Sequence, residues 1–184
     1  MPESPRRPYC PTCHYPLRVC LCDSVTRIDN NCQILILQHP SEVSVAKNTA
    51  RLLALSLNHC TIAIGEQPAD FQHLSIADDA VVLYPNPHSQ PLSIPNAPTA
   101  PPSQLILLDG TWRKAYKLWC SNPWLHQLAI AHLDSPPPST YQRCAKGEQQ
   151  LSTLEACTYA LSVLEGCDPQ PLLSLLAARQ RAGF

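Results

Sequence analysis

The stretch that decides the fold is residues 104–112, Gln-Leu-Ile-Leu-Leu-Asp-Gly-Thr-Trp. Its apolar part, Leu105–Leu108, is a short run of the kind that fills a buried parallel strand. Asp109 ends this run, and Thr111 can cap an amphipathic helix predicted over 113–119. A carboxylate is therefore predicted at the carboxyl end of a central strand, where open α/β sheets bind ligands. The same pattern also fits an aspartate that only ends a strand.

Short apolar runs alternate with helical patterns along the rest of the chain. Further buried strands are predicted over 33–38, 61–64, 80–84 and 128–131. Helices with apolar stripes at helical spacing are predicted over 43–57, 153–165 and 171–181, with a helical turn over 71–76. Two long proline-rich loops, 85–102 and 134–150, lie between these elements. The alternation predicts an α/β fold, with a mostly parallel sheet flanked by helices.

Composition favours one globular domain with at most a small appendage. Of the 184 residues, 45% are hydrophobic and 15% are charged, which suits a protein with a proper core. No stretch approaches the roughly 20 apolar residues of a membrane span, and the first residues lack the apolar run of a secretory signal. We therefore expect a cytoplasmic protein with no membrane partner. In the reducing cytoplasm, ten cysteines indicate metal ligands and buried thiols instead of disulfides.

The charge distribution bears on nucleic-acid binding. The net charge of −1 is not that of a protein that coats nucleic acid. Lys and Arg are absent between Leu52 and Gly110, and they group within 6–51, 113–117, 143–146 and 179–181. If these groups converge on one face, they form a modest phosphate-binding surface. If they do not, each is a solvated surface patch.

Four thiols lie within 13 residues near the N-terminus, at Cys10, Cys13, Cys20 and Cys22. Thiolates favour tetrahedral zinc, and a set of four is typical of a closed structural site. We expect residues 1–31 to form a small zinc-binding module that metal stabilises, because the segment is too short for a core of its own. Residues 32–184 would then form the main domain. An iron–sulfur cluster or free, redox-active thiols are the alternatives.

Further short motifs accompany the aspartate. His39-Pro-Ser-Glu42 and Asn48-Thr-Ala50 follow the first predicted strand, and Leu83-Tyr-Pro85 ends the third. Ser152-Thr-Leu-Glu155 is a capping box at a helix start. This pattern can be a purely structural helix cap, but a helix start also presents N–H groups that suit a ligand carboxylate.

Taken together and in this order, the motifs resemble the signature of the DTW-domain family, over residues 10 to about 165. The resemblance implies transfer of the 3-amino-3-carboxypropyl group of S-adenosylmethionine to N3 of a uridine in tRNA, with release of 5'-methylthioadenosine. It favours a uridine of the variable loop. It also implies a SPOUT-like fold with a C-terminal trefoil knot, which periodicity alone does not predict.

The resemblance assigns roles to particular residues. The proposed catalytic residue is Asp109, as base for the uridine N3–H, although it can also pair with the sulfonium or hold the donor's amine. Donor contacts are implied from Leu83, Tyr84, Pro85, Leu108, Thr111, Trp112, Ser152, Thr153 and Glu155. RNA contacts are implied from His39, Lys47, Asn48, Arg51, Arg113, Lys114 and Arg143. The last is displaced by one position, because the family's Tyr-x-Leu-Arg reads Tyr-Gln-Arg-Cys here, over 141–144.

Two other functions stay open at this point. One is methyl transfer from the same cofactor to RNA by the same fold, and the other is a non-enzymatic, zinc-bearing RNA-binding module. A zinc nucleobase deaminase is excluded, because its His-x-Glu followed by Pro-Cys-x-x-Cys is missing and the Cys-x-x-Cys lies upstream of His39. The sequence leaves open whether the chain is a monomer or a homodimer.

Overall fold

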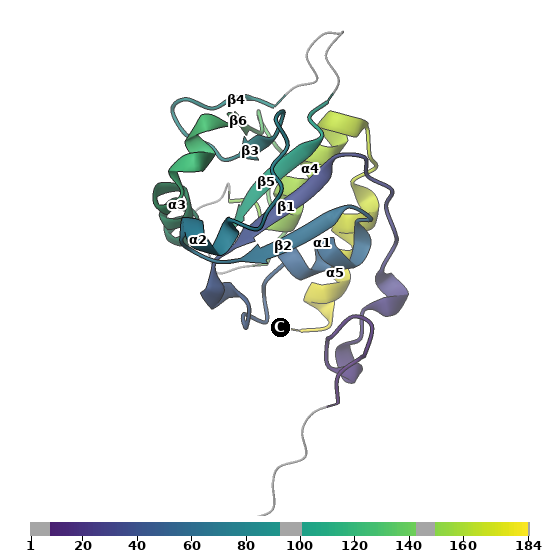
Figure 1. Cartoon of the computed structure of the whole chain (residues 1–184). Coiled ribbons are helices and arrows are strands. Elements are labelled where there is room, and N and C mark those ends of the chain that lie inside the picture. Colours follow the sequence, from purple (N-terminus) through teal and green to yellow (C-terminus); the bar gives the residue numbers. More distant parts are fainter. Residues whose placement is uncertain (1–7, 93–100, 143–149, 184) are drawn as a thin grey trace, which may run out of the picture.

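The computed structural model describes residues 8–92, 101–142 and 150–183 (Figure 1). Its centre is a six-stranded sheet with the order β2-β1-β5-β3-β6-β4. Every neighbouring pair is parallel, so the carboxyl ends of all strands share one edge. The α/β prediction is confirmed. The strands are β1 Gln33–Gln38, β2 Cys60–Ile64, β3 Val81–Leu83, β4 Gln90–Pro91, β5 Gln104–Asp109 and β6 Ala129–His132.

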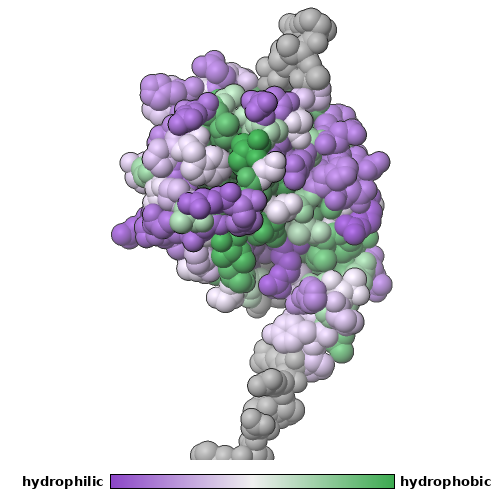
Figure 2. All heavy atoms as spheres, in the orientation of Figure 1, coloured by the Kyte–Doolittle hydropathy of each residue, from purple (hydrophilic) through white to green (hydrophobic). Residues whose placement is uncertain are grey.

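Helices cover both faces of the sheet (Figure 1). On one face lie α1 Ala50–Ser56, α4 Thr153–Glu165 and α5 Gln170–Arg181, and on the other α2 Pro68–Phe71, α3 Trp112–Ser121 and the 3-10 helix Pro123–Gln127. The alternation of side chains along β1 explains the two layers. Ile34 and Ile36 join the core under α1, α4 and α5, whereas Leu35 and Leu37 join the core under α2 and α3. On the face shown in Figure 2, hydrophilic residues cover much of the surface.

The N-terminal segment packs beside α1 and α5 (Figure 1). Buried Tyr15 joins the core beneath these helices, and two guanidinium groups lie over its ring. The Cζ atoms of Arg51 and Arg179 are 5.1 and 4.9 Å from the ring centroid, a distance at which cation–π attraction operates. Burial raises the pKa of the Tyr15 phenol. Tyr15 thus attaches the N-terminal segment to the helical layer, together with the buried side chain of Leu21.

Three predicted elements differ from the structure. The helical turn predicted over 71–76 lies earlier in the chain, as α2, which ends at Phe71. The helix predicted over 43–57 begins only at Ala50. The Asn48 side chain accepts from the Ala50 N–H and Thr49 accepts from Leu154, so local polar side chains compete with helix extension. The loop predicted over 85–102 also contains β4, which pairs with β6. Residues 93–100 lie outside the described part of the chain.

No helix in the described part of the chain combines the length and the apolar character that a membrane crossing requires. The predicted C-terminal trefoil knot is not tested, because residues 143–149 lie outside the described ranges. The knot stays a prediction, as does the division of the chain at residue 31.

The core beneath α4 generates a stability prediction. Leu161 is 1% exposed within the larger apolar cluster. We expect Leu161→Ala to lower the free energy of unfolding by about 2–5 kcal/mol, because it removes buried methyl groups and leaves a cavity. Urea unfolding followed by circular dichroism measures this. Leu17→Ala is the control, since that side chain is 51% exposed; an equal loss in both variants would contradict this description of the core.

Candidate active site

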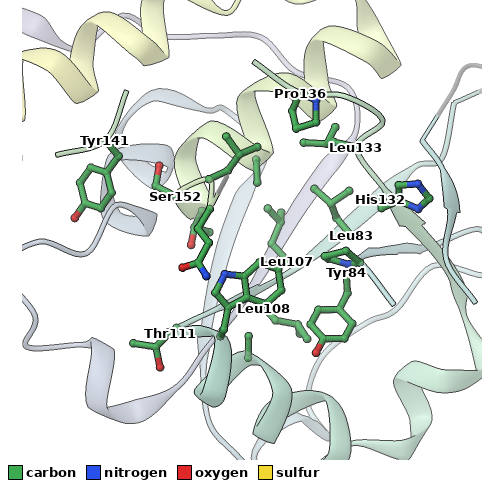
Figure 3. Close-up of a pocket in the computed structure, with 18 of the residues that line it drawn as sticks. Leu83, Tyr84, Leu107, Leu108, Thr111, His132, Leu133, Pro136, Tyr141 and Ser152 are labelled. Atoms are coloured by element: carbon green, nitrogen blue, oxygen red, sulfur yellow. The ribbon is translucent and has the colours of Figure 1, made fainter. Parts of the chain in front are cut away.

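A cavity of about 1480 Å³ opens at the carboxyl edge of the sheet. Its floor consists of the ends of β3, β5 and β6, where parallel sheets bind ligands. In Figure 3, Leu83 and Tyr84 lie on one side of it, and Tyr141 and Ser152 lie opposite. The apolar floor and few polar groups are typical of a small-molecule site. The donor contacts predicted from sequence that line it are Leu83, Tyr84, Pro85, Leu108, Thr111, Trp112, Ser152 and Thr153.

Asp109 is held by side chains from three other parts of the chain. One carboxylate oxygen accepts from Gln38 Nε2 at 2.8 Å and from Asn48 Nδ2 at 2.6 Å, and the other accepts from Thr153 Oγ1 at 2.6 Å. The parallel register sets Gln38 directly beside Asp109. Asp109 is only 3% exposed and does not line the cavity, whereas Thr153 does. The carboxylate therefore reaches the cavity wall through a hydroxyl group.

Glu155 is another buried carboxylate at this edge, and it also lies outside the cavity lining. The predicted capping box is confirmed: Ser152 accepts from the Glu155 N–H, and the Ser152 N–H donates to Glu155. Glu155 further accepts from Ser139 Oγ at 2.8 Å and from the Thr140 N–H at 2.7 Å. One side chain thus caps α4 and anchors the loop that contains the cavity-lining residues 135–138.

The segment 46–49 connects the walls of the site. Lys47 accepts from the Tyr141 hydroxyl through its carbonyl oxygen, and Ala46 accepts likewise from Arg179 Nη2 at 2.9 Å. Asn48 binds Asp109. This four-residue segment therefore contacts the loop before α4, the helix α5 that packs on Tyr15, and the buried carboxylate of Asp109.

Thr111 and Trp112 lie at the start of α3. Thr111 precedes the helix in an extended conformation, but its side chain makes no cap hydrogen bond, so that part of the prediction is wrong. Its carbonyl accepts from Lys114 and Ala115 instead. The Thr111 hydroxyl can therefore face the cavity that it lines.

Aromatic rings continue from the cavity onto the surface. Trp112 is 45% exposed and lies 6.5 Å, centroid to centroid, from Tyr84, which stacks on Trp119 at 5.1 Å. Tyr116, one helical turn after Trp112, is 61% exposed. The sequence interpretation missed Tyr116, although spacing of four residues within a helix puts both rings on one face. Exposed aromatic side chains beside a cavity suit stacking of nucleobases.

Most residues predicted to contact RNA already have protein partners. His39 Nε2 lies 2.7 Å from Glu66, and Lys114 Nζ lies 2.7 Å from buried Glu42. Lys117, with His39, lowers the pKa of the Glu66 carboxyl. Asn48 binds Asp109, and Arg51 packs on Tyr15. Lys47 is exposed, and Arg113 is exposed where it lines the cavity. Arg143 lies outside the described residues.

The four N-terminal cysteines converge as predicted. Their Sγ atoms all lie within 4.8 Å of one another, with Cys10–Cys22 at 3.6 Å and Cys13–Cys20 at 3.7 Å. A tetrahedral zinc with Zn–S bonds near 2.3 Å requires sulfur–sulfur separations of roughly 3.8 Å, so the cluster fits that ion.

The pKa values of these thiols differ within the cluster. The backbone N–H groups of Cys13 and Thr12 lower the pKa of the Cys10 thiol to about 6. Hydrogen bonds with Cys20 and Cys10 raise the pKa of Cys22 to about 12. Four thiolates side by side repel one another, and a divalent cation removes that repulsion by coordinating all of them.

Comparison with known proteins identifies the family. The family model for the DTW domain matches residues 7–181. The chain belongs to the DTW-domain family. Asp109, Thr111 and Trp112 are the residues that match the motif behind the family's name, and all three lie where β5 ends and α3 begins.

Named relatives of this DTW-domain chain come from animals and plants. The chain is 35% identical to "tRNA-uridine aminocarboxypropyltransferase 2" of Drosophila melanogaster, over 87% of this chain and 68% of the relative. The mouse protein of the same name is 33% identical, over 94% and 62%. "tRNA-uridine aminocarboxypropyltransferase A" of Arabidopsis thaliana is 30% identical, over 61% and 50%. The chain thus spans half to about two thirds of their length. No solved structure matches it significantly.

The cysteine cluster generates a metal prediction. We expect one zinc ion per chain, and we expect Cys10→Ser to lower the zinc content and loosen the N-terminal segment because it removes one of four ligands. Elemental analysis and limited proteolysis measure these effects. Cys120→Ser is the matched control, since Cys120 is an exposed thiol on α3, outside the cluster. Less than one zinc per folded wild-type chain would disprove the assignment.

Proposed function

We propose that this chain transfers the 3-amino-3-carboxypropyl group of S-adenosylmethionine to N3 of a uridine in tRNA and releases 5'-methylthioadenosine. The names of its relatives support the reaction class. The observation that carries the proposal is the cavity at the carboxyl edge of the sheet, with a buried aspartate connected to its wall. Such a cavity suits a nucleoside-containing donor, because apolar strand ends can cover a purine ring while polar groups fix its orientation.

We assign the donor one orientation along the cavity. We assign the adenosine to the apolar side formed by Leu83, Tyr84, Pro85 and Leu108, with Trp112 as a wall. We assign the donor's carboxylate to the region of Ser152 and Thr153, because the start of α4 is the positive end of the helix dipole. Glu155 contributes indirectly, by holding the loop that closes this side.

The reaction needs little besides orientation and one base. The uridine N3–H is weakly acidic, so its proton must be removed as N3 attacks the methylene next to the sulfonium. Methylthioadenosine leaves as a neutral thioether, which needs no proton. Asp109 is our candidate for the base, because it is the carboxylate connected to the cavity wall through a single hydroxyl group.

For tRNA we propose docking along the exposed face of α3. Trp112 and Tyr116 offer ring faces for bases, and Arg113, exposed at the cavity, offers a charge for a phosphate. Lys47 and Arg51 are exposed just before and within α1, and we propose that they contact phosphates elsewhere on the tRNA. We propose that residues 1–31 bind zinc through Cys10, Cys13, Cys20 and Cys22 and support tRNA binding, with the metal in a purely structural role.

Mass spectrometry of the products tests the function. Purified protein is incubated with unmodified tRNA and S-adenosylmethionine, and nucleosides and small molecules are analysed. Methylthioadenosine together with an aminocarboxypropylated uridine is the expected result. S-adenosylhomocysteine with a methylated nucleoside would replace the proposal with methyl transfer. Absence of any product with several tRNAs, together with failure to bind S-adenosylmethionine, would favour a binding module.

Asp109 generates the first activity prediction. We expect Asp109→Ala to abolish transfer while the protein stays folded, because the reaction loses its base. Product formation and the thermal unfolding midpoint are measured together. Asp79→Ala is the control, since Asp79 binds Ser103 at the amino end of β5, away from the cavity. Full activity in Asp109→Ala would remove this carboxylate from the chemistry.

The α3 face generates a binding prediction. Tyr116→Ala should weaken tRNA binding by about 1–3 kcal/mol if one base stacks on the ring. Arg113→Ala should reduce the salt dependence of tRNA binding by about one phosphate contact. Fluorescence anisotropy at several salt concentrations measures both. Arg27→Ala is the control, because Arg27 lies beside Leu55 and Leu57, at the far end of α1. Unchanged affinity in Tyr116→Ala would exclude this face.

A further inference from the structure

The contacts of Asp109 leave one route between its carboxylate and the cavity. Three side chains donate to it: Gln38, Asn48 and Thr153. Among the described residues that line the cavity, only Thr153 is one of these donors. Gln38 is buried, and its amide and that of Asn48 donate N–H groups that they do not release near neutral pH. A hydroxyl group differs, because it can accept one proton while it donates another.

We propose that the Thr153 hydroxyl is the group that meets the uridine, and that it passes the N3 proton to Asp109. This inference rests on the proposed function and adds a catalytic residue to it. Thr153, assigned above to the donor site by its position alone, would then contact the nucleophile as well. Asp109 would act through Thr153 without touching the substrate.

The step balances as a single displacement. The uridine N3–H bond breaks, and its proton goes to Thr153 Oγ1 while the original Thr153 hydroxyl proton goes to the Asp109 oxygen 2.6 Å away. The N3 electron pair forms the bond to the donor's methylene carbon. The carbon–sulfur bond breaks, and its electron pair converts the sulfonium to the neutral thioether. Asp109 ends protonated and later loses this proton to solvent.

The local structure keeps the Thr153 hydroxyl in place. Thr153 is the first residue of α4, directly after the cap residue Ser152. The Ser152 hydroxyl is engaged with Glu155, so it does not compete for Asp109. The β-branched side chain of threonine also has few rotamers, which helps to hold Oγ1 toward the carboxylate.

Removal of this hydroxyl is the test. We expect Thr153→Val to lower kcat by about 10²–10⁴-fold, the usual contribution of general-base catalysis, with the KM values for tRNA and S-adenosylmethionine changed little. Thr153→Ser keeps a hydroxyl and should stay within about tenfold of wild type. Thr158→Val is the matched control, because Thr158 lies in the same helix and its hydroxyl binds only the Leu154 carbonyl, away from the cavity.

A substrate with a more acidic uridine distinguishes a catalytic role of Thr153 from a structural one. tRNA made with 5-fluorouridine carries a more acidic N3–H, so it depends less on a base. Thr153→Val should regain much of its lost kcat with this substrate, and its activity on normal tRNA should rise with pH more steeply than that of wild type. A side chain that only holds α4 in place would produce neither effect. If Thr153→Val does not fold, Thr153→Ala is tested in the same way.

The outcomes separate the two proposals. If wild type forms aminocarboxypropyluridine and a folded Thr153→Val or Thr153→Ala variant keeps kcat within threefold, the relay is wrong and the proposed function stands. A kcat loss without recovery on 5-fluorouridine tRNA would also overturn the relay, in favour of a structural role. If wild type forms no aminocarboxypropyluridine, the proposed function itself fails.

Discussion

The buried carboxylate of Asp109 is the constraint on which the site depends. A carboxylate that is 3% exposed is tolerated only where hydrogen-bond donors replace water. Its donors come from the end of β1, from the segment before α1 and from the start of α4. Satisfying one charge therefore fixes the relative positions of three elements. The pairing of β1 with β5, in register at Gln38 and Asp109, supplies the rigid base for this arrangement.

Glu155 is likewise a buried carboxylate that hydrogen-bond donors of the protein satisfy, on the side of the cavity formed by the start of α4. Its carboxylate satisfies the first turn of α4 and the loop at Ser139 and Thr140. The protein's own donors occupy both carboxylates. Among the described residues, the cavity lining is mostly apolar and hydroxyl-bearing, with the amide of Gln150 and with Arg113 as its one formally charged residue other than histidine. In such surroundings, proton transfer from a substrate depends on hydroxyl groups that connect the cavity to the buried carboxylates.

Much of the fold follows from sequence pattern, and the exceptions have physical causes. The strand over 33–38 and the helix over 153–165 match the structure to the residue, because an apolar run and a capping box are strong local signals. The helix predicted from Val43 fails, because Asn48 and Thr49 make long-range contacts that local propensity does not include. For the same reason, the sequence indicated Asp109 but not its separation from the cavity by Thr153. His39 and Lys114, which the sequence predicts as RNA contacts, pair with protein carboxylates distant in sequence, which sequence pattern does not reveal.

A crystal structure of the chain with S-adenosylmethionine bound tests the central claim most directly, because that claim assigns one cavity and one orientation to the donor. We predict the adenosine against Leu83 and Leu108, and the methylene that is transferred beside the Thr153 hydroxyl. A donor bound outside this cavity, or one whose methyl group instead of this methylene faces Thr153, would contradict the account.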